Sequence, residues 1–500
     1  MKIFNRIIRP TFQKVIITGL LLVPAACNDF LNEAPDNRVT LDNLDKAAQL
    51  LTNAYAVASP AFTDWMTDNS DYIRGVTLRQ SHERAYAWED FTDDPDEQDT
   101  PPFFWYETYN AIAHANEVLA VIESIPATTK TDQKRKKAVE AEARLTRAYG
   151  HFMLVNLFGK HYDSNKAESD KGIPYVETPE TIFIKTYKRN TVKEVYDKVE
   201  ADMLKGIELI DDSFFKNSGK YHFNKNAALA FASRFYLFKQ DFDKCIEYST
   251  QMLGSDPGSF VRDLTSQEFQ NASSSPTAYP QLYSSPQQRS NLLLMRKISL
   301  VQRLDFGHGP TNKVYDDIFS SNPFGGTDVR ENPSYQKGEN GAFPARYESL
   351  FERSSLNSNV GTPYHIGIMF RGEEVLLNRA EALAEKNRIT EAMADLQTLA
   401  NKRYSGAVTI TINDLRNFFG VGGLGNVSNR AVVIEWLIRE RRREFLVQGM
   451  RWFDIKRYKI PVKHLLENGA TIELKDDDLR KVLQIPTSAV DVGGLTANPR

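Results

Sequence analysis

The segment from Asn226 to Ser259 constrains the fold of this chain more than any other stretch. It reads "NAALAFASRFYLFKQDFDKCIEYSTQMLGSDPGS" and places large, small and helix-ending residues at the spacing of a tetratricopeptide repeat, namely Leu229, Ser233, Tyr236, Asp241, Phe242, Cys245 and Pro257. That pattern predicts two antiparallel helices with small residues at their closest crossing. Cys245 occupies the crossing, which indicates a buried small side chain rather than a reactive thiol.

A second unit follows the same frame in residues 373–404, "EEVLLNRAEALAEKNRITEAMADLQTLANKRY". A repeat must stack on a neighbour to bury its apolar face, and two units this far apart in the sequence are not a tandem array. We therefore expect other helices to supply the neighbours, with residues 139–159 and 431–458 as the candidates. Residues 190–210 carry a further amphipathic helical pattern that begins with a capping Asn or Thr.

Between the units, residues 254–363 are rich in Ser, Pro, Gly and Asn, which predicts loops and short strands rather than helices. A loop-rich block of this length inside a helical frame is either disordered or functional. Its scattered Tyr and Phe residues are uncommon in disordered linkers, so we expect an ordered, ligand-facing region. The expected fold class is mainly α, with helical repeat elements over about 40–253 and 373–460 supporting this region.

The N-terminus has the composition of a signal peptide. Basic residues precede a short apolar stretch, Val15–Val23, which is about half of the roughly 20 residues that a membrane-spanning helix needs. Ala25 and Ala26 then precede Cys27, which becomes the new N-terminus if residues 1–26 are removed. One interpretation is an ordinary secretory cleavage site. The interpretation we favour is a lipoprotein, in which the Cys27 thiol carries a diacylglycerol and the new amine carries a further acyl chain such as palmitate.

The rest of the composition narrows the function classes. Beyond the N-terminus no run is long enough to span a bilayer. A formal net charge of −3 gives no whole-chain attraction to nucleic acid, and the basic run Lys130–Lys137 fits a solvated helix start. With Cys27 lipidated, Cys245 is the only other cysteine, so no intramolecular disulfide can form.

Motifs of catalysis and cofactor binding are absent or out of context. Residues 420–425, "GVGGLG", match a dinucleotide-binding pattern, but a helical pattern rather than a strand precedes them. The acidic run Asp93–Asp99 lacks the glycine and distal glutamate of a calcium loop, which favours a solvated loop. The cluster Arg439–Glu444 is interpreted as ion pairs rather than an anion site. No H-E-x-x-H or G-x-S-x-G motif occurs, so the sequence predicts no catalytic residue, cofactor or metal site.

Five segments, taken in order, carry a resemblance to a known family. They are "CNDFLNEAP" from Cys27, "WYETYNAIAHANEVLAVIE" (105–123), "EARLTRAYGHFMLVNLFGKH" (142–161), "RERRREFLVQGMRWFDIKR" (439–457) and the closing "LQIPTSAV…NP". The chain resembles a SusD/RagB-type outer-membrane lipoprotein of the Bacteroidetes. It departs from the family pattern at Gln448, where a glutamate is usual, and in its "TANPR" end, and neither departure affects the fold.

The resemblance implies a single SusD-like domain over residues 27–500 and a non-catalytic role. It implies that the protein captures glycans, or less often peptides, and delivers them to a partner SusC-like TonB-dependent outer-membrane transporter. Asp29, close behind the anchor, implies display on the outer face of the outer membrane. Two alternatives stay open: a secreted surface hydrolase with an unrecognised carboxylate pair, and a repeat scaffold that contacts only proteins.

Exposed aromatic rings are the expected glycan contacts, because Trp and Tyr couple a large apolar face to a polar edge. The candidates are aromatic residues in polar stretches outside helical stripes, namely Trp88, Tyr86, Tyr279, Tyr283 and, more weakly, Trp65. Packing in the core or in a loop is the alternative for each of them. Three further tryptophans lie in helical motifs and are expected in the core, namely Trp105, Trp436 and Trp452.

Overall fold

A computed structural model describes residues 41–500 apart from 183–184, 216–217, 304, 332–334 and 424. Residues 41–500 form one compact unit. The predicted signal peptide and Cys27 lie outside the described residues.

The mainly helical fold class that the sequence predicts is confirmed. The α-helices are α2 (Leu44–Leu51), α3 (Gln80–Tyr86), α4 (Pro101–Val121), α5 (Lys130–Phe158), α6 (Val192–Leu209), α7 (Lys225–Lys239), α8 (Phe242–Leu253), α9 (Gln267–Ala272), α10 (Ala278–Tyr283), α11 (Asn312–Phe319), α12 (Gly372–Glu385), α13 (Ile389–Ala400), α14 (Ile412–Phe418), α15 (Asn429–Glu444), α16 (Arg451–Arg457) and α17 (Thr487–Asp491). The strands are β1 (Asp71–Tyr72), β2 (Asn291–Lys297), β3 (His308–Gly309), β4 (Tyr335–Lys337), β5 (Gly341–Phe343), β6 (Leu350–Arg353), β7 (Gly361–Arg371), β8 (Val462–Leu465) and β9 (Thr471–Leu474).

Two long helices begin where their sequences satisfy the free backbone amides of a helix start. At α5 the Thr129 side chain accepts from the Asp132 amide while the Asp132 side chain accepts from the Thr129 amide. Thr191 and Glu194 form the same capping box at α6. The amphipathic segment 190–210 is therefore a helix capped by Thr191, as its sequence predicts.

The tetratricopeptide-like spacing is confirmed as two helix pairs, α7–α8 and α12–α13. Cys245 on α8 is fully buried, and its thiol donates to the carbonyl oxygens of Ser233 on α7 (3.4 Å) and Asn378 on α12 (3.6 Å). Burial raises the pKa of Cys245 to about 12, so the thiol is unreactive.

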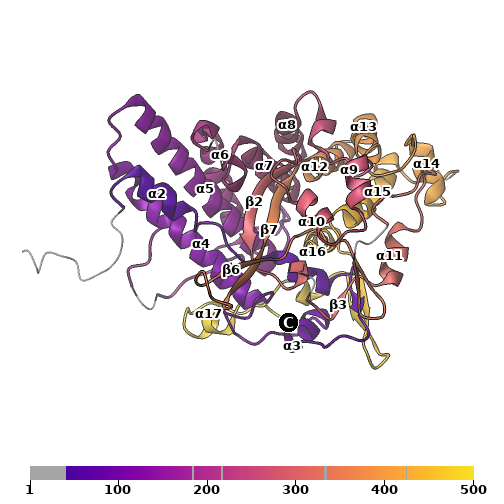
Figure 1. Cartoon of the computed structure of the whole chain (residues 1–500), viewed down its shortest axis with the longest axis horizontal. Helices are drawn as coiled ribbons and strands as arrows, with labels where there is room; N and C mark the ends of the chain where they lie inside the picture. Colours follow the sequence, from indigo (N-terminus) through magenta and orange to yellow (C-terminus); the bar gives the residue numbers. More distant parts are fainter. Residues whose placement is uncertain (1–40, 183–184, 216–217, 304, 332–334, 424) are drawn as a thin grey trace, which may run out of the picture. The chain divides into compact units, whose positions relative to one another are not determined.

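The two pairs also pack on each other, because α12 contacts both α7 and α8. This corrects the expectation that other helices alone supply the neighbours. The helix α6 packs on α7, and α15 packs on α12 and α13, so a continuous series of helices buries the repeat faces. Figure 1 shows α5, α6, α7, α8, α12 and α13 following one another across one side, with α3 and β3 on the opposite side.

The C-terminal helical motif at 431–458 forms two helices rather than one. The first, α15, ends at Glu444 and the second, α16, begins at Arg451. Between them Val447 and Gly449 have positive φ angles of 63° and 72°. A Cβ atom on Gly449 would lie 2.3 Å from the carbonyl oxygen of Pro60, so only glycine allows the two segments to approach this closely.

The loop-rich segment contains helices that its composition did not predict. The helices α9, α10 and α11 lie within it, beside the antiparallel sheet β2–β7–β6 and the hairpin β4–β5. On α10, Tyr279 and Tyr283 are four residues apart and therefore share one helix face, where their rings stack at 5.7 Å. The four-residue spacing of these two tyrosines indicates a helix, and the sequence-based expectation of loops did not take it into account.

Carboxylates of α12 and α15 form buried ion pairs with arginines. Glu444 accepts from Arg403 Nε at 2.7 Å and from Arg330 Nη1 at 3.0 Å. Glu373 meets Arg262 at 3.2 Å and Arg403 at 3.5 Å. We call these five residues the ion-pair network. Burial would raise the pKa of Glu444, but the guanidinium groups of Arg403 and Arg330 bring it well below its usual range. Glu444 is therefore charged and paired, as interpreted for the Arg439–Glu444 cluster.

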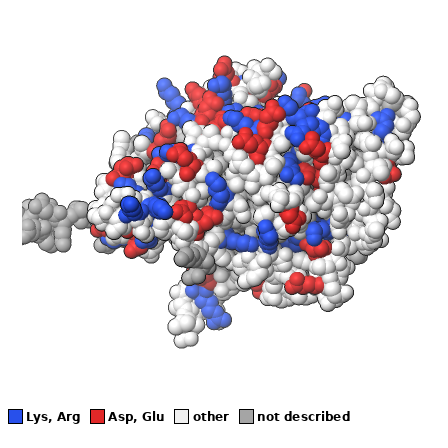
Figure 2. All heavy atoms as spheres, turned by 90° about the horizontal axis from the view of Figure 1, so that it is seen from above, with Lys and Arg blue, Asp and Glu red and all other residues white. Residues whose placement is uncertain are grey.

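The surface mixes charges of both signs. On the face drawn in Figure 2, basic and acidic side chains are interspersed. Within the described part of the chain, none of the helices combines the length and the apolar character needed to cross a bilayer.

Candidate functional site

An open cleft lies on the side of the molecule that carries α3 and β3 (Figure 1). It is formed by β1, α3, β3 and the turn between β8 and β9, and its volume is about 600 Å³. That volume is on the scale of ligand pockets, which run from roughly 300 to 1,000 Å³. The strand pairing β1–β3, with Tyr72 opposite His308, brings together segments more than 200 residues apart in the sequence.

A column of five rings adjoins the cleft, and three of the five line it. The rings of Trp88, His464, Tyr86, His308 and Tyr72 contact one another in that order, with centroid separations of 4.4, 4.0, 4.2 and 6.1 Å. We call them the ring column. Tyr86 and His308 are almost fully buried, whereas Tyr72 is only half-buried. Tyr72 is therefore the ring of the column that is open to a ligand.

Polar contacts fix the middle of the ring column. The Nδ1 and Nε2 atoms of His464 lie 2.7 Å and 2.9 Å from the carbonyl oxygens of Tyr86 and Thr67. Tyr86 donates its hydroxyl hydrogen to the carbonyl oxygen of Leu465 at 2.9 Å. Because the rings are held by hydrogen bonds as well as by stacking, the column is a rigid support.

Trp88 ends the ring column in a strained backbone conformation. Its φ angle is 56°, in a region that bulky residues rarely adopt. The residue follows α3, where the Trp88 amide donates to the Ala85 carbonyl and the Glu89 amide donates to the Arg84 carbonyl. Glycine usually occupies this position of the helix-ending motif. The Trp88 indole donates to the carbonyl oxygen of Met66 at 2.9 Å, and this contact together with the ring stack offsets the strain.

The rim of the cleft is polar and carries acidic side chains. Glu83, Glu89 and Glu467 are exposed there, together with Gln80 and Asn468. Carboxylates and amides accept hydroxyl hydrogens, and an aromatic ring offers an apolar face beside them. The arrangement suits a ligand that carries many hydroxyl groups on a flat apolar ring.

Neighbouring groups and burial determine the protonation and the hydrogen bonds of the titratable side chains in the cleft. Tyr72 donates its hydroxyl hydrogen to Glu467 Oε1 at 3.0 Å, and this hydrogen bond raises the pKa of Tyr72. Burial lowers the pKa of His308 to about 3, so its imidazole is neutral at physiological pH. The guanidinium of Arg84 donates from Nη1 to the Asp90 carbonyl oxygen at 3.3 Å and to Thr92 Oγ1 at 3.1 Å.

Three of the predicted ligand residues lie near the cleft or beneath it, but none is exposed as predicted. Tyr86 lines the cleft with 2% of its surface exposed, and Trp88 is 3% exposed beside a smaller hollow. Trp65 is 1% exposed, and its ring packs at a tilt against that of His82, with the centroids 3.8 Å apart. The polar local sequence was misleading, because the rings that cover Tyr86 and Trp88 come from remote segments.

The other two predicted residues lie away from the cleft, against the ion-pair network. Tyr283 is 1% exposed, with the Arg262 guanidinium 3.8 Å from its ring centroid and its hydroxyl accepting from Arg371 Nη1 at 3.1 Å. Tyr279 is half-buried and stacks on Tyr283. The expectation of two exposed loop rings is therefore wrong for Tyr283 and holds only in part for Tyr279. The three tryptophans expected in the core are buried there, at 0–4% exposure.

Tyr72 was missed by the sequence reasoning. It lies in "TDNSDYIRGV", a polar stretch without helical period, so the rule that selected Trp88 would have selected Tyr72 as well. The rim residues carried no such signal, because acidic residues in loops are common and their convergence is spatial.

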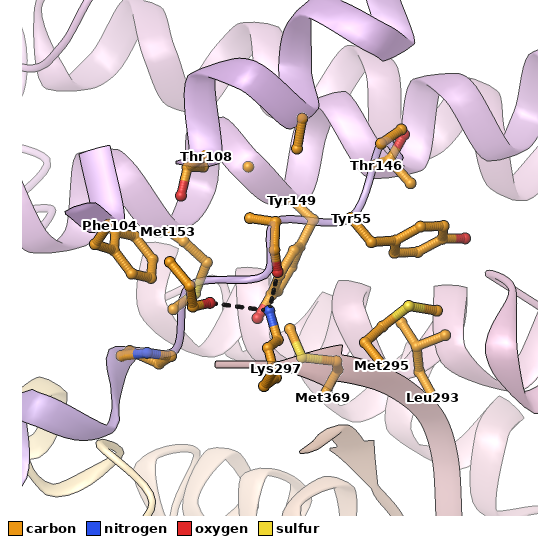
Figure 3. A pocket seen from close by; sticks show the side chains of 16 residues that line it. Tyr55, Phe104, Thr108, Thr146, Tyr149, Met153, Leu293, Met295, Lys297 and Met369 are labelled. Carbon is orange, nitrogen blue, oxygen red and sulfur yellow. Dashed lines mark hydrogen bonds between the residues drawn. The ribbon is translucent and has the colours of Figure 1, made fainter. Parts of the chain in front are cut away.

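A second hollow is internal and small. Figure 3 shows Lys297 reaching among the side chains of Tyr149, Met153 and Met369 into a cavity of about 30 Å³, where it donates to the backbone carbonyls of Ala56 and Ala58. Burial lowers the pKa of Lys297 to about 7. The cavity has room for about one or two water molecules, so it cannot hold an organic ligand.

A third hollow, of about 670 Å³, runs along α15, and we call it the α15 hollow. Its charged side chains are largely paired, since Arg442 and Arg451 both contact Asp68 at 3.5 Å and 2.9 Å. Its lining, as far as the structure describes it, lacks the ring column that distinguishes the cleft. The cleft is therefore the stronger candidate site.

Over the part of the chain that the structure describes, no group of three or more His, Cys, Asp or Glu side chains could hold a metal ion. The described residues of the 420–425 segment lie in turns that follow α14. Because a helix precedes them, the strand of a dinucleotide-binding motif is missing there.

Comparisons with known proteins converge on one family. A family model described as "Starch-binding associating with outer membrane" matches residues 29–237, and the SusD family model matches residues 331–487. The chain belongs to the SusD family. Both matched stretches contribute to the cleft, the first through β1 and α3 and the second through the β8–β9 turn.

Similar proteins support this assignment over most of the chain. SusD-like protein P2 of Formosa agariphila is 24% identical over 401 residues, which is 73% of each chain. A SusD superfamily protein from Bacteroides thetaiotaomicron has a structure with a TM-score of 0.68 at 20% identity, covering 92% of this chain and 100% of that one. A laminarin-binding SusD-like protein has a TM-score of 0.59 at 15% identity, covering 91% and 98%. At such identities the structural likeness shows the SusD fold.

Proposed function

We propose that this SusD-family protein is a non-catalytic, cell-surface lipoprotein that binds glycans in the cleft. The observation that carries the proposal is the combination, in one open cleft, of the half-buried ring of Tyr72 with the hydrogen-bonding side chains of the rim. A sugar presents flat C–H faces beside hydroxyl groups. An aromatic ring covers the first and a carboxylate accepts from the second.

Each part of the site then has a defined role. A sugar ring lies over Tyr72, whose orientation is fixed by the tilted contact of its ring with His308 and by the hydrogen bond to Glu467. Glu83 on α3 and Glu467 in the β8–β9 turn accept hydroxyl hydrogens. Tyr86 supports the ring column from within the wall. Its small exposed fraction leaves it at most an edge contact with the ligand.

A glycan array followed by titration calorimetry tests this proposal. Tyr72→Ala should weaken binding of the array's best neutral oligosaccharide by about tenfold to a hundredfold, by analogy with aromatic stacking on nucleic-acid bases. The melting temperature should stay unchanged, because the ring is at the open end of the column. Tyr221→Ala is the matched control, since Tyr221 is 38% exposed and lies outside the cleft lining. Unchanged affinity in a folded Tyr72→Ala variant would reject the cleft as the glycan site.

The membrane anchor is a separate part of the proposal. The family description associates such proteins with the outer membrane, and Cys27 follows a short apolar run and two alanines. We assign the acyl chains to Cys27 and display to the outer face. In labelling with a fatty-acid probe, Cys27→Ser should lose the label and leave the membrane fraction. Cys245→Ala, which changes the buried thiol, should keep both, and a labelled Cys27→Ser variant would contradict the assignment.

Delivery to a SusC-like TonB-dependent transporter completes the proposed role. The continuous helical series, α5 to α8 with α12, α13 and α15, offers a broad rigid surface for docking on such a partner. Affinity purification from native membranes in mild detergent should recover a large β-barrel in near-equal amount. Recovery of the protein alone would count against delivery, and release of new reducing ends from any bound glycan would count against the non-catalytic assignment.

A further inference from the structure

The charged side chains of the cleft bear on which class of glycan it binds. Resting on the proposed function, we infer that the cleft selects uncharged glycans and rejects those that carry sulfate or uronate groups. The inference follows from which charged side chains reach the cleft and which of them have partners.

Among the described residues, three carboxylates and one guanidinium line the cleft. Glu83 lies on α3, Glu89 just after it and Glu467 in the β8–β9 turn, and all three are exposed. In the described part of the chain, neither lysine nor arginine forms an ion pair with any of them. Arg84 is the cation of the described lining, and its Nη1 donates to neutral acceptors, the Asp90 carbonyl oxygen and Thr92 Oγ1. One guanidinium offsets only one of the three carboxylates.

Basic residues next to the cleft do not neutralise the negative charge of its lining. Arg74 pairs with Glu339 at 3.7 Å and Arg79 pairs with Asp305 at 2.8 Å, so the two arginines between β1 and α3 are each matched by a carboxylate. The imidazole of His308 is neutral, because burial lowers its pKa to about 3. The described lining therefore keeps an excess of negative charge at physiological pH.

This excess acts on the two classes of glycan in opposite directions. Hydroxyl groups that donate to a carboxylate form charge-assisted hydrogen bonds, which are shorter and stronger than neutral ones. A sulfate or uronate in the same cleft has no hydrogen to donate and lies within the Debye length of the carboxylates, about 8 Å at physiological ionic strength. Discrimination thus comes from a repulsive element as well as an attractive one.

A matched pair of ligands tests the inference on the purified protein. The pair is a neutral glycan that binds, for example laminarin, and the same backbone after chemical sulfation. At low salt the sulfated form should bind at least about tenfold more weakly, and the gap should narrow as salt is raised because screening weakens repulsion. Affinity for the neutral form should be nearly constant over the same salt series.

Variants without the cleft carboxylates test whether these groups cause the discrimination against the sulfated glycan. Glu83→Gln, Glu89→Gln and Glu467→Gln combined should bring the sulfated form to within about threefold of the neutral one, since the shape is kept and the repulsion is gone. The control replaces three exposed glutamates on α4, α8 and α9 by glutamine, which changes the total charge equally, at Glu117, Glu247 and Glu268. The control should discriminate as the wild type does.

The outcomes separate the inference from the proposed function. If no neutral glycan binds the wild type, the proposed function fails and the inference fails with it. If the neutral form binds and the sulfated form binds equally or more tightly at low salt, the function stands and the inference is overturned. If the control variant loses discrimination, the effect belongs to total charge and the inference is overturned as well. Should the triple cleft variant not fold, the wild-type salt series still decides.

Discussion

Carboxylate side chains have different roles in the ion-pair network and in the cleft. In the network Glu373 and Glu444 are almost fully buried, and each meets two arginines. In the cleft Glu83, Glu89 and Glu467 are exposed, and no cation pairs with them among the described residues. A buried carboxylate requires a paired guanidinium, because desolvation of an isolated charge is costly. An exposed carboxylate keeps its water and can exchange it for the hydroxyl groups of a ligand.

Breaking the network should produce the largest effect on stability. Glu444→Gln keeps the shape of the side chain but removes one buried counter-charge from Arg403, which retains Glu373, and from Arg330, which retains Asp328 and Glu440. We expect the free energy of unfolding to fall by about 3–5 kcal/mol, measured by denaturant titration. Glu435→Gln, at an exposed position of the same helix, should change it by no more than about 0.5 kcal/mol. Equal effects of the two variants would show that the network does not hold the fold.

Lys297 provides a contrast to the ion-pair network. It is a buried amine that donates to two backbone carbonyl oxygens, and no carboxylate of the described residues forms an ion pair with it. Burial lowers its pKa from the ordinary 10.5 to about 7. Between these values the unfolded chain binds more protons than the folded one, so this group makes wild-type stability rise as pH rises from 7 to 10.5. Lys297→Met should remove that contribution and raise stability at pH 7 by about 2 kcal/mol, since each pKa unit is worth about 1.4 kcal/mol and two hydrogen bonds are lost.

Denaturant titrations of wild type and Lys297→Met across this pH range measure the difference in slope. Lys463→Met, at an exposed position of β8, is the matched control and should run parallel to the wild type. Parallel curves for Lys297→Met would mean that the lysine is not desolvated in the folded state.

Within the cleft, the supporting rings should behave differently from the ligand-facing ring. His464→Phe keeps a ring between Tyr86 and Trp88 but removes both polar contacts to carbonyl oxygens. We expect a loss of about 1–2 kcal/mol in stability and only a few-fold loss in glycan affinity. Tyr72→Ala should show the reverse, with affinity lost and stability kept. The same pattern of loss in both variants would remove the distinction between support and ligand face.

The sequence predicted the parts of the fold that depend on nearby residues. The cap at Thr191 and the small residue at Cys245 are local signals, and both are where the spacing placed them. The packing of α12 on α7 and α8 could not be read in this way, because nothing near Asn378 indicates that it reaches Cys245. The end of the helix at Glu444 was also not predicted from local spacing, because it depends on the close approach of Pro60 to Gly449.

The cleft was predictable only in part for the same reason. Tyr86 and Trp88 were selected as ligand residues from their polar neighbours, but His464 covers both rings and lies more than 370 residues further along the chain. The partner of Tyr72, Glu467, is equally remote. When a site is assembled from three distant segments, its aromatic residues are the only signal that a single sequence offers. Their burial in the folded protein then determines which of them can contact the ligand.

The structure of the protein with a neutral oligosaccharide bound is the most direct test of the central claim. A sugar ring should lie over Tyr72, with its hydroxyl groups within hydrogen-bonding distance of Glu467 and Glu83. The ion-pair network should be unchanged on binding. A sugar bound in the α15 hollow or against Tyr279, with the cleft empty, would contradict the claim that the cleft is the glycan site.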